Sequence, residues 1–105
     1  MKPIDALEFR SFQEFYPYYL TQHRDRRCRR MHFIGSTSAF VGLCTAVFTL
    51  NPLWLVAGIS SGYAFAWTGH FCFERNRPAA FQNAVWSFAG DWVMYTQMLR
   101  GKISF

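Results

Sequence analysis

The residues best suited to chemistry in this sequence are three histidines and one acidic residue. The histidines are His23, His32 and His70, and Glu74 follows His70 by four positions, so these two share one helix face. Imidazoles and a carboxylate that leave coordination positions open suit a non-haem Fe(II) that must bind oxygen. The spacing alone is a weak signal, because three histidines near membrane boundaries can also be ordinary interfacial side chains. A metal site and a structural role both stay open at this point.

The longest uncharged stretch of the chain is residues 31–73, which contains no Asp, Glu, Lys or Arg. Its length suits two membrane-crossing helices of roughly 20 residues each. The Asn51-Pro52 pair in the middle is a turn signal, because proline ends one helix and can begin the next. We therefore predict a transmembrane hairpin with helices over residues 33–50 and 53–73.

The hairpin determines where the histidines lie, because both of its ends are on one side of the bilayer. His32 at the entrance and His70 near the exit then become neighbours in space. Small residues let the two legs pack closely; they are Gly35, Ser36, Ser38, Ala39, Gly42, Gly58, Ser60, Ser61, Gly62, Ala64 and Ala66. His23 precedes His32 by nine positions, which is about 180° around a helix. The chain must therefore turn within residues 24–30 if both are to face one site.

Composition and charge place the chain, residues 1–105, among single-domain membrane proteins. It is 51% hydrophobic and 20% aromatic, as expected for a lipid-facing protein with aromatic belts. The net charge of +5 comes mainly from residues 24–30, RDRRCRR, which suit the positive-inside rule or anionic lipid better than nucleic acid. With Arg75 and Arg77 after the second helix, this run predicts a cytoplasmic site in an integral protein of the bacterial inner membrane, or of the endoplasmic reticulum in a eukaryote.

An amphipathic helix is predicted before the hairpin, over residues 5–22. Asp5 and Glu8 have the spacing of a capping box, and apolar residues then recur at helical intervals. Pro17 should kink or restart this helix. The segment is too short and too polar to span a bilayer, so we expect it to lie in the interface with its aromatic face on lipid.

A third apolar segment, residues 79–99, repeats its large apolar side chains at the spacing of one helix face. Asn83, Ser87 and Asp91 form a polar stripe on another face. A carboxylate inside a membrane is usually functional or paired, so Asp91 and Asn83 are candidates to support metal ligands. Spanning and interfacial placements both stay open. The predicted fold is thus an all-α membrane protein with an interfacial helix, a two-helix hairpin and a third amphipathic or embedded helix.

Three runs of the sequence carry a family resemblance: HRDRRCRRMHFIG at residues 23–35, AWTGHFCFERNRPA at residues 66–79 and WSFAGDW at residues 86–92. They resemble a family of small membrane proteins that includes the yeast 2-hydroxy fatty acid dioxygenase of phytosphingosine breakdown. The resemblance covers roughly residues 12–102, and its most specific part is the Gly-His-x-x-x-Glu-x-x-x-Pro-Ala element. It implies an Fe(II)-dependent membrane dioxygenase that uses O₂ to shorten a 2-hydroxy fatty acid by one carbon.

The resemblance also implies roles for individual residues. The metal ligands, and the essential histidines, would be His23, His32 and His70. Glu74 and Asp91 match acidic positions of the family pattern, with Glu74 expected in the catalytic site. Iron held in this way keeps positions open for O₂ and for the carboxylate and 2-hydroxyl oxygens of the substrate.

Arginines beside the site can pair with the substrate carboxylate; the candidates are Arg24, Arg27, Arg75 and Arg77. Their positions equally suit a topology signal alone. The acyl chain is expected along the small-residue groove of the hairpin or in adjacent lipid, and a homo-oligomer is left open. The alternative function is a non-enzymatic membrane protein that binds lipid or acts as a scaffold, with structural histidines.

The charge pattern generates a topology prediction. In a variant without the native cysteines, Asn51→Cys should react with an impermeant maleimide added outside intact cells, because the uncharged turn is translocated. Arg75→Cys should react only after the membrane is permeabilised. The reverse labelling pattern would contradict the predicted hairpin orientation.

Overall fold

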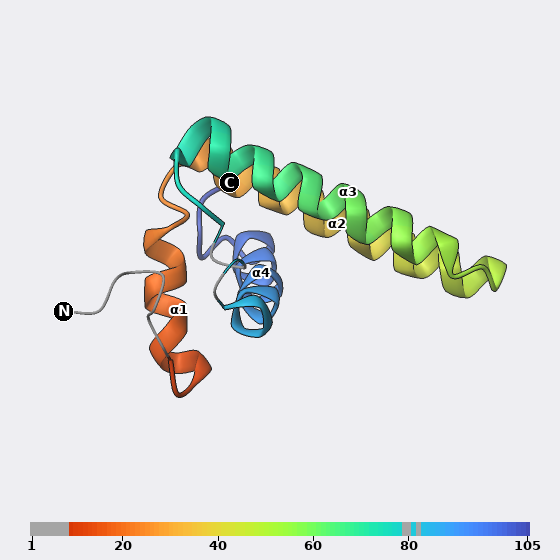
Figure 1. Ribbon diagram of the computed structural model, residues 1–105, viewed down its shortest axis with the longest axis horizontal. Helices are drawn as coiled ribbons and strands as arrows, with labels where there is room; N and C mark the ends of the chain where they lie inside the picture. Colours follow the sequence, from red (N-terminus) through yellow and green to blue (C-terminus); the bar gives the residue numbers. More distant parts are fainter. Residues whose placement is uncertain (1–8, 79–80, 82) are drawn as a thin grey trace.

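The computed structural model describes residues 9–78, 81 and 83–105, among which helices joined by turns are present and no strand is found. Its elements are α1 (Phe12–Thr21), α2 (Arg26–Thr49), α3 (Leu53–Gly69), the π-helical turn η2 (His70–Glu74) and α4 (Ala84–Leu99). α2 and α3 run antiparallel as one long hairpin, and α1 and α4 lie beside only one end of it (Figure 1). The all-helical class predicted from the sequence is confirmed.

The helix boundaries near the arginine run differ from those predicted. α2 begins at Arg26 rather than residue 33, because the Asp25 side chain caps it by accepting a hydrogen bond from the Arg27 N–H at 2.8 Å. Arginine is a good helix former, so the arginine run forms the first turns of α2. The chain therefore turns at residues 22–25, whereas the sequence predicted a turn within residues 24–30.

The first helix also differs from its prediction. The Asp5 and Glu8 capping box lies outside the described residues, and α1 is capped instead by the Ser11 hydroxyl, which accepts from the Glu14 N–H at 3.2 Å. The helix continues through Pro17 without restarting. Its aromatic face is covered by protein rather than lipid; the buried cluster of α1 and α4 comprises Phe15, Tyr19, Met94 and Met98.

The hairpin depends on close contact between glycines of its two legs. A Cβ added to Gly35 would lie 2.5 Å from the Gly62 carbonyl oxygen, and one added to Gly42 would lie 2.7 Å from the Gly58 Cα. Larger residues at these points would force the backbones apart. Of the predicted small residues, the glycines make the closest contacts, with Ser38 and Ala39 beside Gly58. Ser60 and Ala64 are exposed.

The bounds of α2, α3 and α4 can be compared with the predicted membrane crossings. α4 begins at Ala84, later than the predicted residue 79, and residues 79–80 and 82 lie outside the described residues. Within the described part of the chain, α2 is the one helix long and apolar enough to cross a membrane, with a mean hydropathy of 1.4 in its most apolar window. α3 has 17 residues before η2 begins, so two membrane crossings stay a prediction.

Gly42→Val should lower the thermal unfolding midpoint of the purified protein, since the added side chain overpacks the hairpin at a cost of about 1–3 kcal/mol. Ala64→Val adds a similar volume at an exposed position of α3 and serves as the matched control. Equal midpoints for the two variants would show that the close contact does not support the hairpin.

Candidate metal centre

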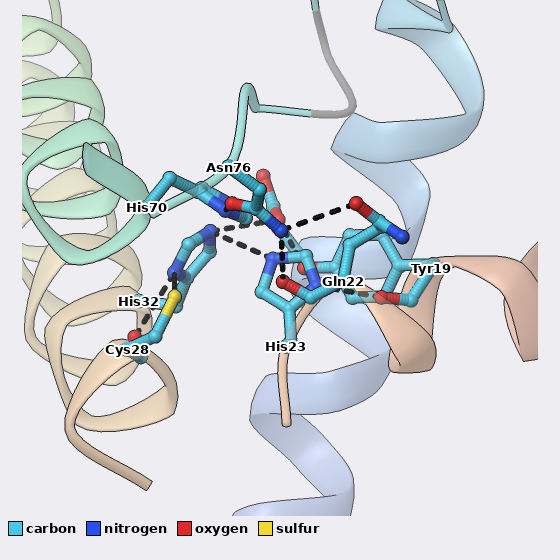
Figure 2. A network of polar contacts seen from close by, with 8 residues as sticks. Tyr19, Gln22, His23, Cys28, His32, His70 and Asn76 are labelled. Atoms are coloured by element: carbon cyan, nitrogen blue, oxygen red, sulfur yellow. Dashed lines mark hydrogen bonds and ion pairs between the residues drawn. The ribbon is translucent and has the colours of Figure 1, made fainter. Parts of the chain in front are cut away.

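The three histidines of the chain meet at the end of the hairpin that α1 and α4 cover (Figure 2). His23 lies in the turn between α1 and α2, His32 on α2, and His70 at the start of η2. One ligand nitrogen from each lies within 4.8 Å of the others, and all three side chains are buried. The Nε2 atoms of His23 and His32 are 3.1 Å apart.

Hydrogen bonds at Nδ1 fix the tautomer of each imidazole. His23 Nδ1 lies 2.7 Å from the Tyr19 carbonyl oxygen, and His32 Nδ1 lies 3.1 Å from the Cys28 carbonyl oxygen. A carbonyl only accepts, so each Nδ1 carries the proton and donates. In a neutral imidazole the lone pair is then on Nε2.

Asn76 fixes the third imidazole in the same way. Its Oδ1 lies 2.7 Å from His70 Nδ1, while its Nδ2 donates to the Gln22 backbone oxygen at 3.2 Å and to the Gln22 side-chain oxygen at 3.1 Å. These two bonds orient the amide, so its oxygen accepts from His70. All three Nε2 atoms therefore carry lone pairs inside one cluster.

Such a cluster suits a metal ion better than an empty core. Two Nε2 lone pairs 3.1 Å apart repel each other unless a cation lies between them. Neighbouring nitrogen ligands about 2.1 Å from a first-row metal ion lie about 3.0 Å apart in octahedral geometry, which matches His23 and His32. Ligand histidines also typically donate their other N–H to an oxygen, as all three do here.

The charge state of His23 also suits a ligand. Burial, followed by the neighbouring imidazoles of His32 and His70, lowers the pKa of His23 well below 6.5. The ring is therefore neutral near pH 7, and its lone pair is available for coordination. Its ring stacks on Tyr19 with centroids 4.0 Å apart, which holds its orientation.

Asp91, one of the two predicted supporting residues, has its carboxylate beside the cluster. Its Oδ1 lies 3.9 Å from His32 Nε2 and accepts a hydrogen bond from the Tyr19 hydroxyl. Burial raises the pKa of Asp91 to about 7. The other predicted supporting residue, Asn83, lies at the start of α4, and its side chain makes no capping hydrogen bond there.

Glu74 serves the architecture of the site rather than the cluster. Its carboxylate accepts a hydrogen bond from the Asp25 N–H, which ties the turn carrying His23 to the end of η2. Arg75 follows with a φ of 59°, and this left-handed residue turns the chain so that Asn76 returns to His70. In the described part of the chain, Glu74 is not among the residues whose ligand atoms converge.

The predicted arginines lie outside the cluster, and all four are exposed. Arg27 pairs with Asp25 at 3.0 Å, and the Arg77 guanidinium carbon lies 5.9 Å from the Phe81 ring centre. Arg24 and Arg75 make no side-chain hydrogen bond among those found in the described residues.

Several residues that build the site were missed in the sequence. Arg29 donates to the His23 carbonyl oxygen at 3.1 Å and so holds the turn between α1 and α2. Tyr19 and Cys28 each precede a histidine by four positions, a helical spacing that could have signalled their carbonyl contacts. No local pattern points to Asn76, because a π-helical turn and a left-handed residue place it.

A small cavity lies against the cluster, lined by all three histidines, Asp91 and Ser87. Ser87 is 3% exposed, and its hydroxyl has no hydrogen-bond partner within the described residues. A buried hydroxyl without a partner is costly. The cavity is therefore suited to a polar group beside the three histidines.

A family model described as 2-hydroxy-palmitic acid dioxygenase Mpo1-like matches residues 9–103. The chain belongs to the Mpo1-like family. This confirms the family expected from the sequence. No curated protein and no solved structure matches the chain. The Mpo1-like name describes a dioxygenase, and the three converging imidazoles are able to hold a metal ion.

In this Mpo1-like chain, Asn76→Ala should lower metal affinity by about 10–100-fold, because His70 loses the acceptor that fixes its tautomer. Asn83→Ala is the matched control, since Asn83 lies outside the network. Titration of the two metal-free variants with Fe(II) under anaerobic conditions measures their metal affinities. Equal affinities would contradict the role assigned to Asn76.

Proposed function

We propose that this protein is an Fe(II)-dependent membrane dioxygenase that shortens 2-hydroxy fatty acids by one carbon. The observation that carries the proposal is the convergence of three Nε2 lone pairs, each imidazole held by an Nδ1–H bond to an oxygen. The Mpo1-like family supports the reaction class and the 2-hydroxy acid substrate.

Fe(II) is the metal we assign to His23, His32 and His70. Imidazole ligands suit zinc, copper, iron and nickel alike, so the donor set alone does not select among them. Zinc has no redox chemistry, whereas a dioxygenase of the kind named by the family needs a metal that reacts with O₂. Bound Fe(II) would supply that reactivity, which the side chains lack.

Asp91 is the residue we assign to proton transfer. Its carboxylate lies beside His32 and lines the small cavity, so it can accept the proton of the substrate 2-hydroxyl. Tyr19 holds the carboxylate in place through its hydroxyl while its ring stacks on His23. Glu74 acts as a positioning residue, because it holds the turn that carries His23.

The four arginines Arg24, Arg27, Arg75 and Arg77 are proposed to attract the anionic substrate. They are exposed and lie in the segments next to His23 and His70. Exposed cations raise the local concentration of an anionic ligand without contacting it in the final complex. The same charges favour the cytoplasmic side of a bilayer.

A membrane location fits both the substrate and the exposed surface of the hairpin. The half of the hairpin beyond α1 and α4 exposes large apolar side chains, each more than half exposed; they include Phe40, Val47, Phe48, Leu50, Leu53 and Val56. An apolar surface this extensive requires a lipid or protein partner. We propose that this half crosses the bilayer, with the metal centre at the cytoplasmic face.

The direct test is iron content together with oxygen-dependent turnover of 2-hydroxyhexadecanoic acid to the acid one carbon shorter. His32→Ala and His70→Ala should each lose bound iron and activity while the protein stays in the membrane. Cys44→Ala changes an exposed residue of α2 and should retain both. Wild-type protein without stoichiometric iron or turnover would favour the lipid-binding or scaffold alternative.

Asp91→Asn tests the proton-transfer role separately. The amide oxygen can still accept from Tyr19, but it cannot act as a base, so kcat should fall by about 10²–10⁴-fold with iron content unchanged. Asp25→Asn is the control, because asparagine caps a helix as well as aspartate does. Activity of Asp91→Asn equal to that of this control would exclude Asp91 as the base.

A further inference from the structure

Two surfaces of the hairpin are open to an alkyl chain, and they differ in what they reach. One is a narrow slot between the hairpin and α4. His32 and Asp91 lie at its inner end, Ala39 and Ile59 at its outer end, and Phe88 and Trp92 form the α4 side. The other is a wider groove of about 570 Å³, lined by residues such as Val41 and Trp54, with neither a histidine nor an acidic residue.

The slot lies next to the small cavity at the three histidines. Both spaces are lined by His32, Tyr63, Ala66 and Asp91. The inner cavity contributes the unpartnered Ser87 hydroxyl, whereas the walls of the slot are mainly apolar. The combined space is therefore polar beside the histidines and apolar further along the hairpin, which is the polarity of a fatty acid.

The direction of the slot follows from the helices that line it. From His32 to Ala39 the slot advances seven residues along α2, or about 10 Å, toward the Asn51 turn. This length matches the carboxyl-proximal carbons of a long acyl chain. Ile59 and Phe88 are 39% and 51% exposed at its edges, so the distal carbons can leave the protein for lipid.

We propose that the substrate binds with an oxygen of its head group hydrogen-bonded to Ser87 and its alkyl chain in the slot between the hairpin and α4. The wider groove on the other face of the hairpin takes no part. This inference rests on the proposed function, because the head group must reach the histidines. It makes Ser87 a substrate-binding residue and Ile59 a determinant of chain length.

The alkyl path is tested by two matched substitutions of exposed aliphatic residues. Ile59→Trp obstructs the slot, and Val41→Trp obstructs the wider groove. Ile59→Trp should lower kcat/KM for 2-hydroxyhexadecanoic acid about tenfold or more, and change it less than about threefold for 2-hydroxyoctanoic acid. Val41→Trp should change kcat/KM for either substrate by no more than about threefold. A chain-length effect of Val41→Trp, with none for Ile59→Trp, would overturn the assignment.

The head-group contact is tested by binding to zinc-substituted protein, which has no redox chemistry. Ser87→Ala should raise the dissociation constant of 2-hydroxyhexadecanoic acid about tenfold, the effect of one lost hydrogen bond to a charged group. Ser60→Ala is the exposed control and should leave it unchanged. Equal binding by both variants would remove Ser87 from the site.

A photoreactive substrate separates failure of this inference from failure of the proposed function. A 2-hydroxy fatty acid with a diazirine about 10 Å along its alkyl chain, at the outer end of the slot, should label Ile59 or Phe88 in zinc-substituted protein. Labelling at Val41 or Trp54 instead would overturn the slot even if the enzyme is active. Absence of turnover by wild-type iron protein would contradict the dioxygenase assignment, and with it this inference, whatever the labelling.

Discussion

The arrangement on which the rest of this structure depends is three neutral imidazoles with their Nε2 lone pairs facing one another. The arrangement is unfavourable by itself, since lone pairs 3.1 Å apart repel and burial opposes the protonation of His23 that would relieve the repulsion. The protein imposes it through three oxygen acceptors, contributed by Tyr19, Cys28 and Asn76. A bound cation would turn the same repulsion into coordination, so the strain is informative about function.

The fold supplies what this arrangement requires. Glycine contacts bring the legs of the hairpin close enough for His32 and His70 to meet, and packing of α1 against α4 closes the third side with His23. A Cβ on Gly90 would lie 3.0 Å from the Tyr19 ring, so α4 approaches α1 closely at this point. Packing therefore gathers the buried histidines at one end of the hairpin and leaves the other end apolar and exposed.

The hairpin and the meeting of His32 with His70 could be predicted from the sequence, for identifiable reasons. The uncharged stretch around Asn51-Pro52 specified an antiparallel hairpin, and an antiparallel hairpin necessarily brings His32 and His70 together. The need for a turn before His32 followed from helix periodicity. The supporting residues could not be predicted in the same way, because Asn76 depends on a π-helical turn and a left-handed Arg75. Glu74 has the spacing of a ligand to His70 but bonds to the Asp25 backbone, a tertiary contact that helix periodicity does not encode.

Coordination of iron by the three histidines is tested most directly by X-ray absorption spectroscopy of the anaerobic Fe(II)-loaded protein, with a His70→Ala variant for comparison. A three-histidine centre should give imidazole scattering from three nitrogen ligands at about 2.1 Å, and the variant should lose imidazole scattering or the iron itself. Sulfur scattering from Cys28, or a wild-type iron site whose spectrum is the same in His70→Ala, would contradict a three-histidine centre.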